Sequence, residues 1–172
     1  MRGEELEAIR EALNGDPFAR ILGIEIQEIK EGYGRASMRV RADLLNSQGF
    51  AHGGAIFSLA DMAFAAASNS HNRVAVALSV NVNYRRPVRE GMELLAEAFE
   101  ESLGRSTALY RILVRTKDGE LIAACQGLAF RMDREFLGTG SGADHEWAGA
   151  SRRPVGDGFS DESGDISGSW RG

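Results

Sequence analysis

The sequence is poor in the features of secreted, membrane-bound or nucleic-acid-binding proteins. Cys125 is the single cysteine among 172 residues, so no disulfide can form within the chain, and a reducing compartment is expected. The basic residues form no tract, and the net charge of −5 argues against binding to nucleic acid or to an anionic membrane. Residues 1–13 are charged throughout and do not resemble a signal peptide. We therefore expect a cytoplasmic protein that binds neither nucleic acid nor membrane.

One long segment almost lacks charge. Residues 53–70 contain a single charged side chain, that of Asp61. The segment approaches the length of a membrane span, but it has no flanking anchors and carries the acid in its middle. Ile56, Leu59 and Phe64 recur at helical spacing, which predicts a helix buried within the protein. A carboxylate in such a helix is costly unless it is paired, hydrogen-bonded or functional.

The remaining pattern predicts an α+β fold. A short helix over 4–13 and a turn at 18–22 precede two strands, the long helix follows, and four more strands come after it. The six strands are expected at 23–30, 35–42, 75–85, 92–102, 105–117 and 120–132. In the first of them Ile29 is out of phase with Ile24 and Ile26. Because the long helix is apolar nearly all round, the sheet is expected to wrap it, with a partner covering the rest.

The composition changes near residue 137. Residues 138–172 contain nine Gly and six Ser and few aliphatic side chains. Such a stretch buries too little apolar surface to offset the entropy lost on ordering. We therefore expect one folded domain over residues 1–136 and a disordered tail over 137–172.

A motif surrounds the start of the long helix. Asn46 precedes His52-Gly53-Gly54 by a short gap, and Asp61 follows the second glycine by seven residues. Residues 52–70 and the following 80–91 resemble the hotdog-fold acyl-CoA thioesterases, in particular their phenylacetic-acid-degradation (PaaI-type) group. The resemblance covers roughly residues 15–132. It implies an antiparallel sheet wrapped around one helix, hydrolysis of acyl-CoA to free acid and CoA, and a homodimer or a dimer of dimers, with no cofactor besides the CoA of the substrate.

Asp61 and the two glycines are the predicted catalytic centre. Asp61 either attacks the thioester carbonyl or activates a water as general base, and the sequence leaves both routes open. The amides of Gly53 and Gly54, at the positive end of the helix dipole, are expected to stabilise the oxyanion. Gly54 and Asp61 of one helix lie about 10 Å apart along its axis, too far to act on one carbonyl. Two antiparallel helices would solve this, so we expect an obligate dimer with composite sites.

Other residues have weaker claims to the site. His52 either orients the loop or assists the oxyanion or the leaving thiolate. The resemblance implies that Asn46 holds the attacking water or the carboxylate, whereas asparagine is also a common turn residue. Arg85, Arg86 and Arg105 are candidates for binding the CoA phosphates, the alternative being solvated surface charge. No cluster with metal-ligand spacing is present, so no metal is expected.

The acyl group is less constrained by the sequence. The resemblance implies phenylacetyl, hydroxyphenylacetyl or medium-chain groups, and aromatic side chains such as Phe57 and Tyr84 either line a pocket or pack in the core. Three other functions compete: a non-catalytic acyl-CoA-binding protein, a hotdog hydratase acting on the acyl chain, and a structural dimerisation module. Release of free thiol distinguishes the thioesterase from all three.

Overall fold

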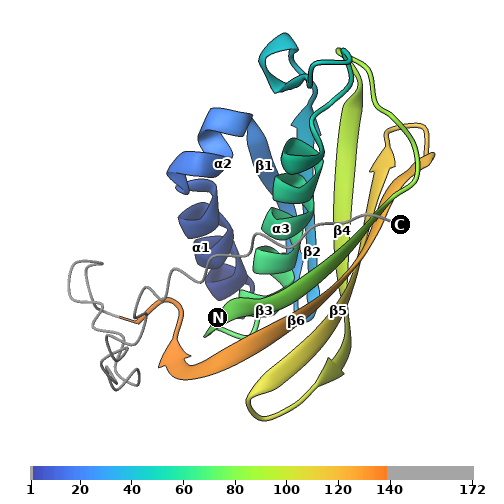
Figure 1. The fold of residues 1–172 in the computed structure, drawn as a ribbon. Helices are drawn as coiled ribbons and strands as arrows, with labels where there is room; N and C mark the ends of the chain where they lie inside the picture. Colours follow the sequence, from blue (N-terminus) through green and yellow to red (C-terminus); the bar gives the residue numbers. More distant parts are fainter. Residues whose placement is uncertain (1, 139–172) are drawn as a thin grey trace, which may run out of the picture. The chain divides into compact units, whose positions relative to one another are not determined.

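The computed structural model describes residues 2–138 (Figure 1). Apart from its first two residues, the predicted tail over 137–172 lies outside the described residues. Along the chain the elements are α1 (Arg2–Asn14), α2 (Pro17–Leu22), β1 (Ile24–Lys30), β2 (Tyr33–Arg39), the 3₁₀ turn η1 (Ala42–Leu44), α3 (Gly53–Asn69), β3 (Arg73–Tyr84), β4 (Glu93–Leu103), β5 (Thr107–Thr116) and β6 (Leu121–Glu135). The predicted order is confirmed, and most boundaries shift by one to three residues.

The six strands form one antiparallel sheet in the order β1-β2-β4-β5-β6-β3. The sheet curves around α3, while α1 and α2 lie beside α3 at the β1 end (Figure 1). Because α3 separates β2 from β3 in sequence, β3 crosses over and pairs with β6 at the opposite edge of the sheet. The predicted α+β arrangement, a sheet wrapped around one long helix, is confirmed.

The inner face of α3 is made of small and apolar side chains, which allow it to approach the sheet closely. Ala63, Ala66 and Ala67 are fully buried, and the ring of Phe64 packs on that of Tyr110 with 5.2 Å between centroids. A Cβ atom at Gly34 of β2 would lie 2.5 Å from the carbonyl oxygen of Ala63. The helix therefore rests directly on the backbone of β2, and only one stripe of its surface stays open.

A β-bulge explains the irregular spacing in β1. The pairing with β2 shifts register between Ile26 and Glu28, so one extra residue is inserted there. As a result Ile24, Ile26 and Ile29 all point into the core, although Ile29 is out of phase in the sequence. With strict alternation Ile29 would lie on the solvent face, and the bulge turns it back into the core.

A polar cluster fixes the other end of α3. His71 Nε2 lies 2.7 Å from Oε2 of Glu100, and the hydroxyl of the fully buried Tyr110 donates to the same oxygen at 2.9 Å. The Ser70 hydroxyl accepts the Gly32 amide at 2.8 Å. These bonds tie the C-terminal end of α3 to β4, β5 and the β1–β2 turn, so the helix is held at both ends.

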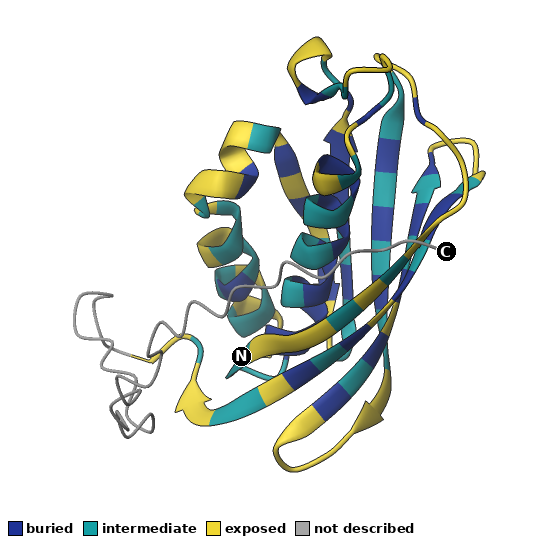
Figure 2. Ribbon diagram, in the orientation of Figure 1, coloured by how far each residue is buried: buried dark blue, intermediate teal, exposed yellow. Residues whose placement is uncertain are grey.

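β3 is one of the two edge strands of the sheet, and its surface is unusual for an edge. None of the residues of β3 is buried (Figure 2). The exposed ones include the large apolar residues Val76 and Leu78. An open edge with apolar side chains is a template for pairing with another chain. Among residues 2–138, none of the helices combines the length and apolar character that crossing a bilayer requires.

The close approach at Gly34 gives the first prediction. Gly34→Ala places a methyl group against the backbone of α3, and overpacking of this kind lowers the free energy of unfolding by roughly 1–3 kcal/mol. Gly3→Ala is the matched control, because a Cβ atom there meets nothing within 4 Å. Urea denaturation of both variants checks this; equal midpoints for Gly34→Ala and the wild type would contradict it.

Candidate active site

His52 forms the N-cap of α3. Its Nδ1 atom accepts the amide proton of Gly54 at 2.9 Å, while its carbonyl accepts the amides of Ala55 and Ile56. The amide of Gly53 has no acceptor among the described residues. Of the two predicted oxyanion donors, the Gly53 amide is thus free and the Gly54 amide is hydrogen-bonded to the His52 side chain. The orienting role considered for His52 is present in this structure.

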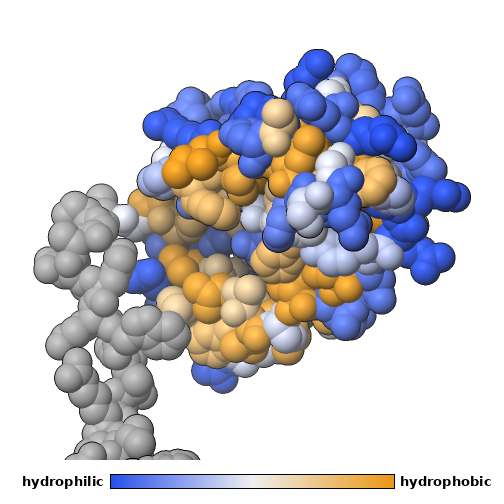
Figure 3. Space-filling model, turned by 45° about the horizontal axis from the view of Figure 1, so that its top comes forward, coloured by the Kyte–Doolittle hydropathy of each residue, from blue (hydrophilic) through white to orange (hydrophobic). Residues whose placement is uncertain are grey.

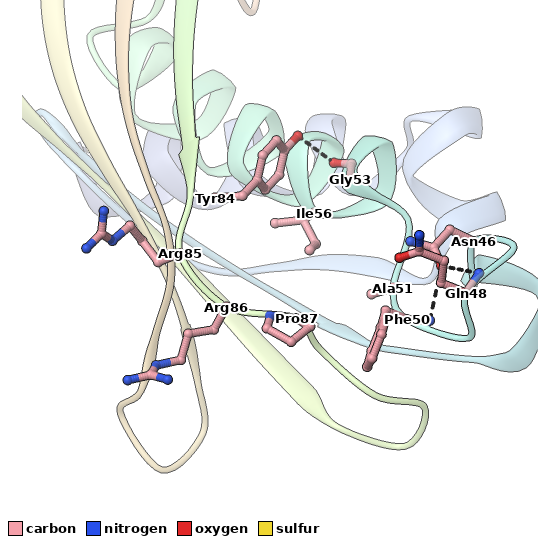
Figure 4. A pocket seen from close by; sticks show the side chains of 10 residues that line it. All are labelled: Asn46, Gln48, Phe50, Ala51, Gly53, Ile56, Tyr84, Arg85, Arg86 and Pro87. Carbon is pink, nitrogen blue, oxygen red and sulfur yellow. Dashed lines mark hydrogen bonds between the residues drawn. The ribbon is translucent and has the colours of Figure 1, made fainter.

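Tyr84 holds the first glycine from the other side. Its hydroxyl, at the end of β3, donates to the carbonyl oxygen of Gly53 at 2.8 Å (Figure 4). A Cβ atom at Gly53 would lie 3.3 Å from the Tyr84 ring and hydroxyl, so the glycine permits this contact. Sequence reasoning considered Tyr84 only as a pocket or core side chain. The sequence signal was the position of Tyr84 at the end of a predicted strand. That signal did not reveal the contact, because only the folded chain brings this strand end to the start of α3.

Asn46 shapes the loop before α3. Its side-chain oxygen accepts the backbone amides of Gln48 at 2.9 Å and Phe50 at 3.2 Å, which is the turn role considered from the sequence. The loop nevertheless places Asn46 in the same cavity as Gly53 (Figure 4). No described residue accepts a hydrogen bond from the Asn46 side-chain amide, so its protons are available to a ligand.

Asp61 lies on the open stripe of α3, two turns beyond Gly54. The stripe comprises the exposed or half-buried residues Gly53, Gly54, Phe57, Ser58, Asp61, Met62 and Ala65. The Asp61 carboxylate makes no hydrogen bond or ion pair with any described residue. Desolvation raises the pKa of Asp61 above its ordinary value of 3.8, and the nearby negative charge of Asp16 raises it further. A half-buried, unpaired carboxylate is expensive for the fold, which is the pattern of a functional acid.

Two cavities, each of about 380 Å³, flank the start of α3. The arginine cavity, on the β3 side, is lined by Asn46, Gln48, Phe50, Ala51, Gly53, Ile56, Tyr84, Arg85, Arg86 and Pro87 (Figure 4). The apolar cavity, on the α2 side, is lined by Phe18, Leu22, Asp43, Leu44, Leu45, His52, Gly54, Ala55, Phe57 and Ser58. Gly53 borders the first and Gly54 the second, so the two amides sit between a cationic and an apolar compartment.

The three candidate arginines are not brought together within one chain. Arg85 and Arg86 follow the end of β3 at the arginine cavity, where Arg86 pairs with Glu120 at 2.8 Å. Arg105 lies near the start of β3, because its carbonyl accepts a hydrogen bond from Arg73 at 3.0 Å. One chain therefore presents two of the three arginines to the cavity, and Arg105 belongs to the opposite end of the strand.

Within the part of the chain that the structure describes, neither a reactive thiol nor a cluster of metal ligands adds to the chemistry of this site. Burial raises the pKa of the Cys125 thiol to about 11, so it is a protonated core residue at neutral pH. Within residues 2–138, no three His, Cys, Asp or Glu side chains are grouped so as to hold a metal ion. The polar groups around the helix start are backbone amides, the His52 imidazole, the Tyr84 phenol, the Asn46 carboxamide and the guanidinium groups of Arg85 and Arg86.

Comparison with known proteins assigns the chain to a family. Residues 48–123 match the thioesterase superfamily. A putative esterase of Archaeoglobus fulgidus is 39% identical over 136 residues, covering 78% of this chain and 88% of the relative. The acyl-coenzyme A thioesterase PaaI of Escherichia coli is 36% identical over 123 residues, covering 72% of this chain and 88% of that protein. The chain belongs to the thioesterase superfamily.

The solved structures place it more closely within this superfamily. The structure of the E. coli PaaI protein from the phenylacetic acid degradation operon superposes with a TM-score of 0.74 at 33% identity, over 77% of this chain and 96% of that one. The predicted assignment to the PaaI-type hotdog thioesterases is confirmed, and with it the hotdog fold and the class of thioester hydrolases. The matched region includes the start of α3 and Asp61.

The raised pKa of Asp61 predicts a stability effect. Because the folded-state pKa lies above the unfolded value, ionisation disfavours the fold, and this penalty grows as the pH rises from about 3.8 through the folded-state pKa. Asp61→Asn removes it and should raise the urea midpoint at pH 7, with a smaller gain at pH 4. Asp133→Asn is the control, because this carboxylate is fully exposed and forms a surface ion pair with Arg73 at 3.8 Å; both midpoints should stay close to those of the wild type. An Asp61→Asn protein that is less stable than the wild type at pH 7 would contradict the raised pKa of Asp61 in the folded chain.

Proposed function

We propose that this protein hydrolyses acyl-CoA thioesters to the free acid and CoA, at a site where Asp61 of one chain acts on a carbonyl bound at Gly53-Gly54 of a second chain. The observation that carries the proposal is the unpaired, half-buried carboxylate two turns after a glycine helix start that is flanked by two cavities. The similarity to the E. coli acyl-coenzyme A thioesterase supports the thioester as the substrate.

The helix start supplies the electrophilic half of the site. A thioester oxygen at the Gly53 amide, with the Gly54 amide recruited from His52, would receive two N–H donors at the positive end of the α3 dipole. Donors of this kind stabilise the negative oxygen of the tetrahedral intermediate more than the neutral carbonyl, so they lower the barrier. The Tyr84 hydroxyl holds the Gly53 peptide, and so keeps the first turn in place.

Asp61 supplies the other half by one of two balanced routes. As general base it takes a proton from water, hydroxide adds to the carbonyl carbon, and the C–S bond breaks to release CoA thiolate, which then takes up a proton. As nucleophile it adds to the carbonyl itself, expels the thiolate and forms a mixed anhydride that water hydrolyses. Either route uses the ionised carboxylate. Neither consumes a redox cofactor or requires a metal.

Pairing of β3 with β3 of a second chain would assemble both halves. β3 is an open edge with exposed apolar Val76 and Leu78, and an antiparallel pair about a two-fold axis is the simplest closed arrangement of such an edge. In that pairing the start of one β3 meets the end of the other. Arg105 of the partner would then lie at the end of the strand that carries Arg85 and Arg86, which makes the three arginines one candidate site for CoA phosphates.

Aromatic acyl groups such as phenylacetyl and hydroxyphenylacetyl, together with medium-chain groups, are the proposed substrates. The structural likeness to a protein of the phenylacetic acid degradation operon supports the aromatic class. The apolar cavity, at about 380 Å³, falls within the range of small-ligand sites, which is about 300–1,000 Å³.

The role of Asp61 gives a direct kinetic prediction. Asp61→Asn should lower kcat for phenylacetyl-CoA by about 10²–10⁴-fold, because the neutral amide can neither attack nor accept a proton, while the KM changes little. Thiol release, followed with a thiol-reactive dye, measures both constants. Asp133→Asn serves as the control and should keep wild-type turnover. Wild-type turnover in Asp61→Asn would refute the mechanism.

A heterodimer tests whether the site is composite. Asp61→Asn and Gly54→Val, in which the side chain covers the amide, should each be inactive alone. Co-expressed with two different tags and purified as a mixed dimer, they contain one intact and one doubly defective site, so about half of wild-type activity should return. A site confined to one chain leaves the mixed dimer inactive, and failure to isolate any dimer excludes the shared site.

A further inference from the structure

The apolar cavity lies between α2, η1 and α3. We propose that α2 and η1 form the acyl-binding wall of the active site, and that Phe18 and Leu22 select aromatic acyl groups over short ones. The inference rests on the proposed function and adds to it the residues that set the acyl preference.

The position of the cavity relative to the helix start identifies its occupant. Gly54 and His52 stand at its rim, and Gly53 borders the arginine cavity on the other side. A thioester carbonyl at these amides must direct its two substituents apart. The CoA portion carries phosphates and suits the side of Arg85 and Arg86, so the acyl group is directed into the apolar cavity.

The lining of this cavity suits an aromatic ring. Apolar side chains come from three elements: Phe18 and Leu22 from α2, Leu44 beside Leu45 from η1 and the residue after it, and Phe57 from α3. Phe18 is 60% exposed in the single chain, which is a large apolar surface left in water on a six-residue helix. An apolar group bound beside it would remove that surface from water, and aromatic pairs gain about 0.5–1.5 kcal/mol beyond area burial.

Although α2 is short, hydrogen bonds hold both of its ends. Asp16 caps its N-terminus by accepting the Ala19 amide at 2.8 Å, and Gly23 ends it at a φ of 71°. Arg41 then donates to the carbonyls of Ile21 at 2.9 Å and Leu22 at 3.0 Å, and holds Asp43 of η1 at 3.1 Å. A guanidinium on the negative end of the helix dipole thus binds α2 to η1. These bonds hold the backbone that carries Phe18 and Leu22 at both ends of α2.

Figure 3 shows apolar side chains gathered on one face of the molecule. A control for the acyl wall is an exposed apolar side chain of α2 that does not line the cavity. Ile21 lies on α2 and is 69% exposed, more than Phe18, but it does not line the cavity. A general effect of removing exposed apolar surface from α2 would therefore appear at Ile21 as well as at Phe18. An effect through the acyl group would appear only at the lining residues.

The test compares kcat/KM for phenylacetyl-CoA and butanoyl-CoA in the full chain. Phe18→Ala, which removes the ring from the wall, should lower the phenylacetyl to butanoyl ratio at least tenfold, in line with the roughly 10–200-fold that apolar pocket contacts contribute to selectivity. Leu22→Trp, which fills the cavity, should lower the same ratio. Ile21→Ala should keep the wild-type ratio.

The outcomes separate this inference from the function on which it rests. Unchanged ratios in both Phe18→Ala and Leu22→Trp, with an active wild type and an inactive Asp61→Asn, overturn the acyl-wall assignment and leave the function standing. An equal fall of the ratio in Ile21→Ala also overturns it. A wild type that releases no thiol from either substrate refutes the proposed function, and the acyl wall with it.

Discussion

The close packing of α3 on the sheet is the constraint from which the site follows. Gly34 and the alanines at 63, 66 and 67 bring the helix onto the backbone of β2, so most of the residues of α3 are buried. Only one stripe is left open, and the glycine helix start and Asp61 both lie on it. The same packing that stabilises the fold therefore decides which groups of an apolar helix can meet a substrate.

At Asp61 the requirements of stability and of the proposed function conflict. Desolvation raises the pKa of Asp61, which means that the folded chain holds a carboxylate in a place that disfavours its charge. No described residue compensates by a hydrogen bond or an ion pair. Active sites commonly retain such a group at the expense of stability, because its reactivity depends on the absence of a satisfied partner. At the helix start, by contrast, the Gly54 amide is satisfied by the His52 side chain, which the proposed mechanism requires a substrate to replace.

The two cavities determine how a thioester would be oriented in the proposed site. Gly53 and Gly54 are adjacent in sequence, yet one borders a compartment with two arginines and the other a compartment of leucine and phenylalanine side chains. A thioester has one polar, phosphorylated substituent and one acyl substituent, so a carbonyl bound between these compartments has a single orientation that suits both. Tyr84 and Arg41, one on each side, fix the walls by hydrogen bonds to backbone carbonyls.

The sequence by itself determined the element order, the buried helix and the motif from Asn46 to Asp61, because helical and strand periodicities and a glycine helix start are local properties of the chain. It showed Ile29 out of phase with Ile24 and Ile26 but not the reason, which is a bulge set by pairing with β2. Only the tertiary structure decided that Tyr84 holds Gly53 and that Arg105 lies away from Arg85. These contacts join residues from separate elements, or depend on where a strand ends in space, and no local pattern encodes such distances.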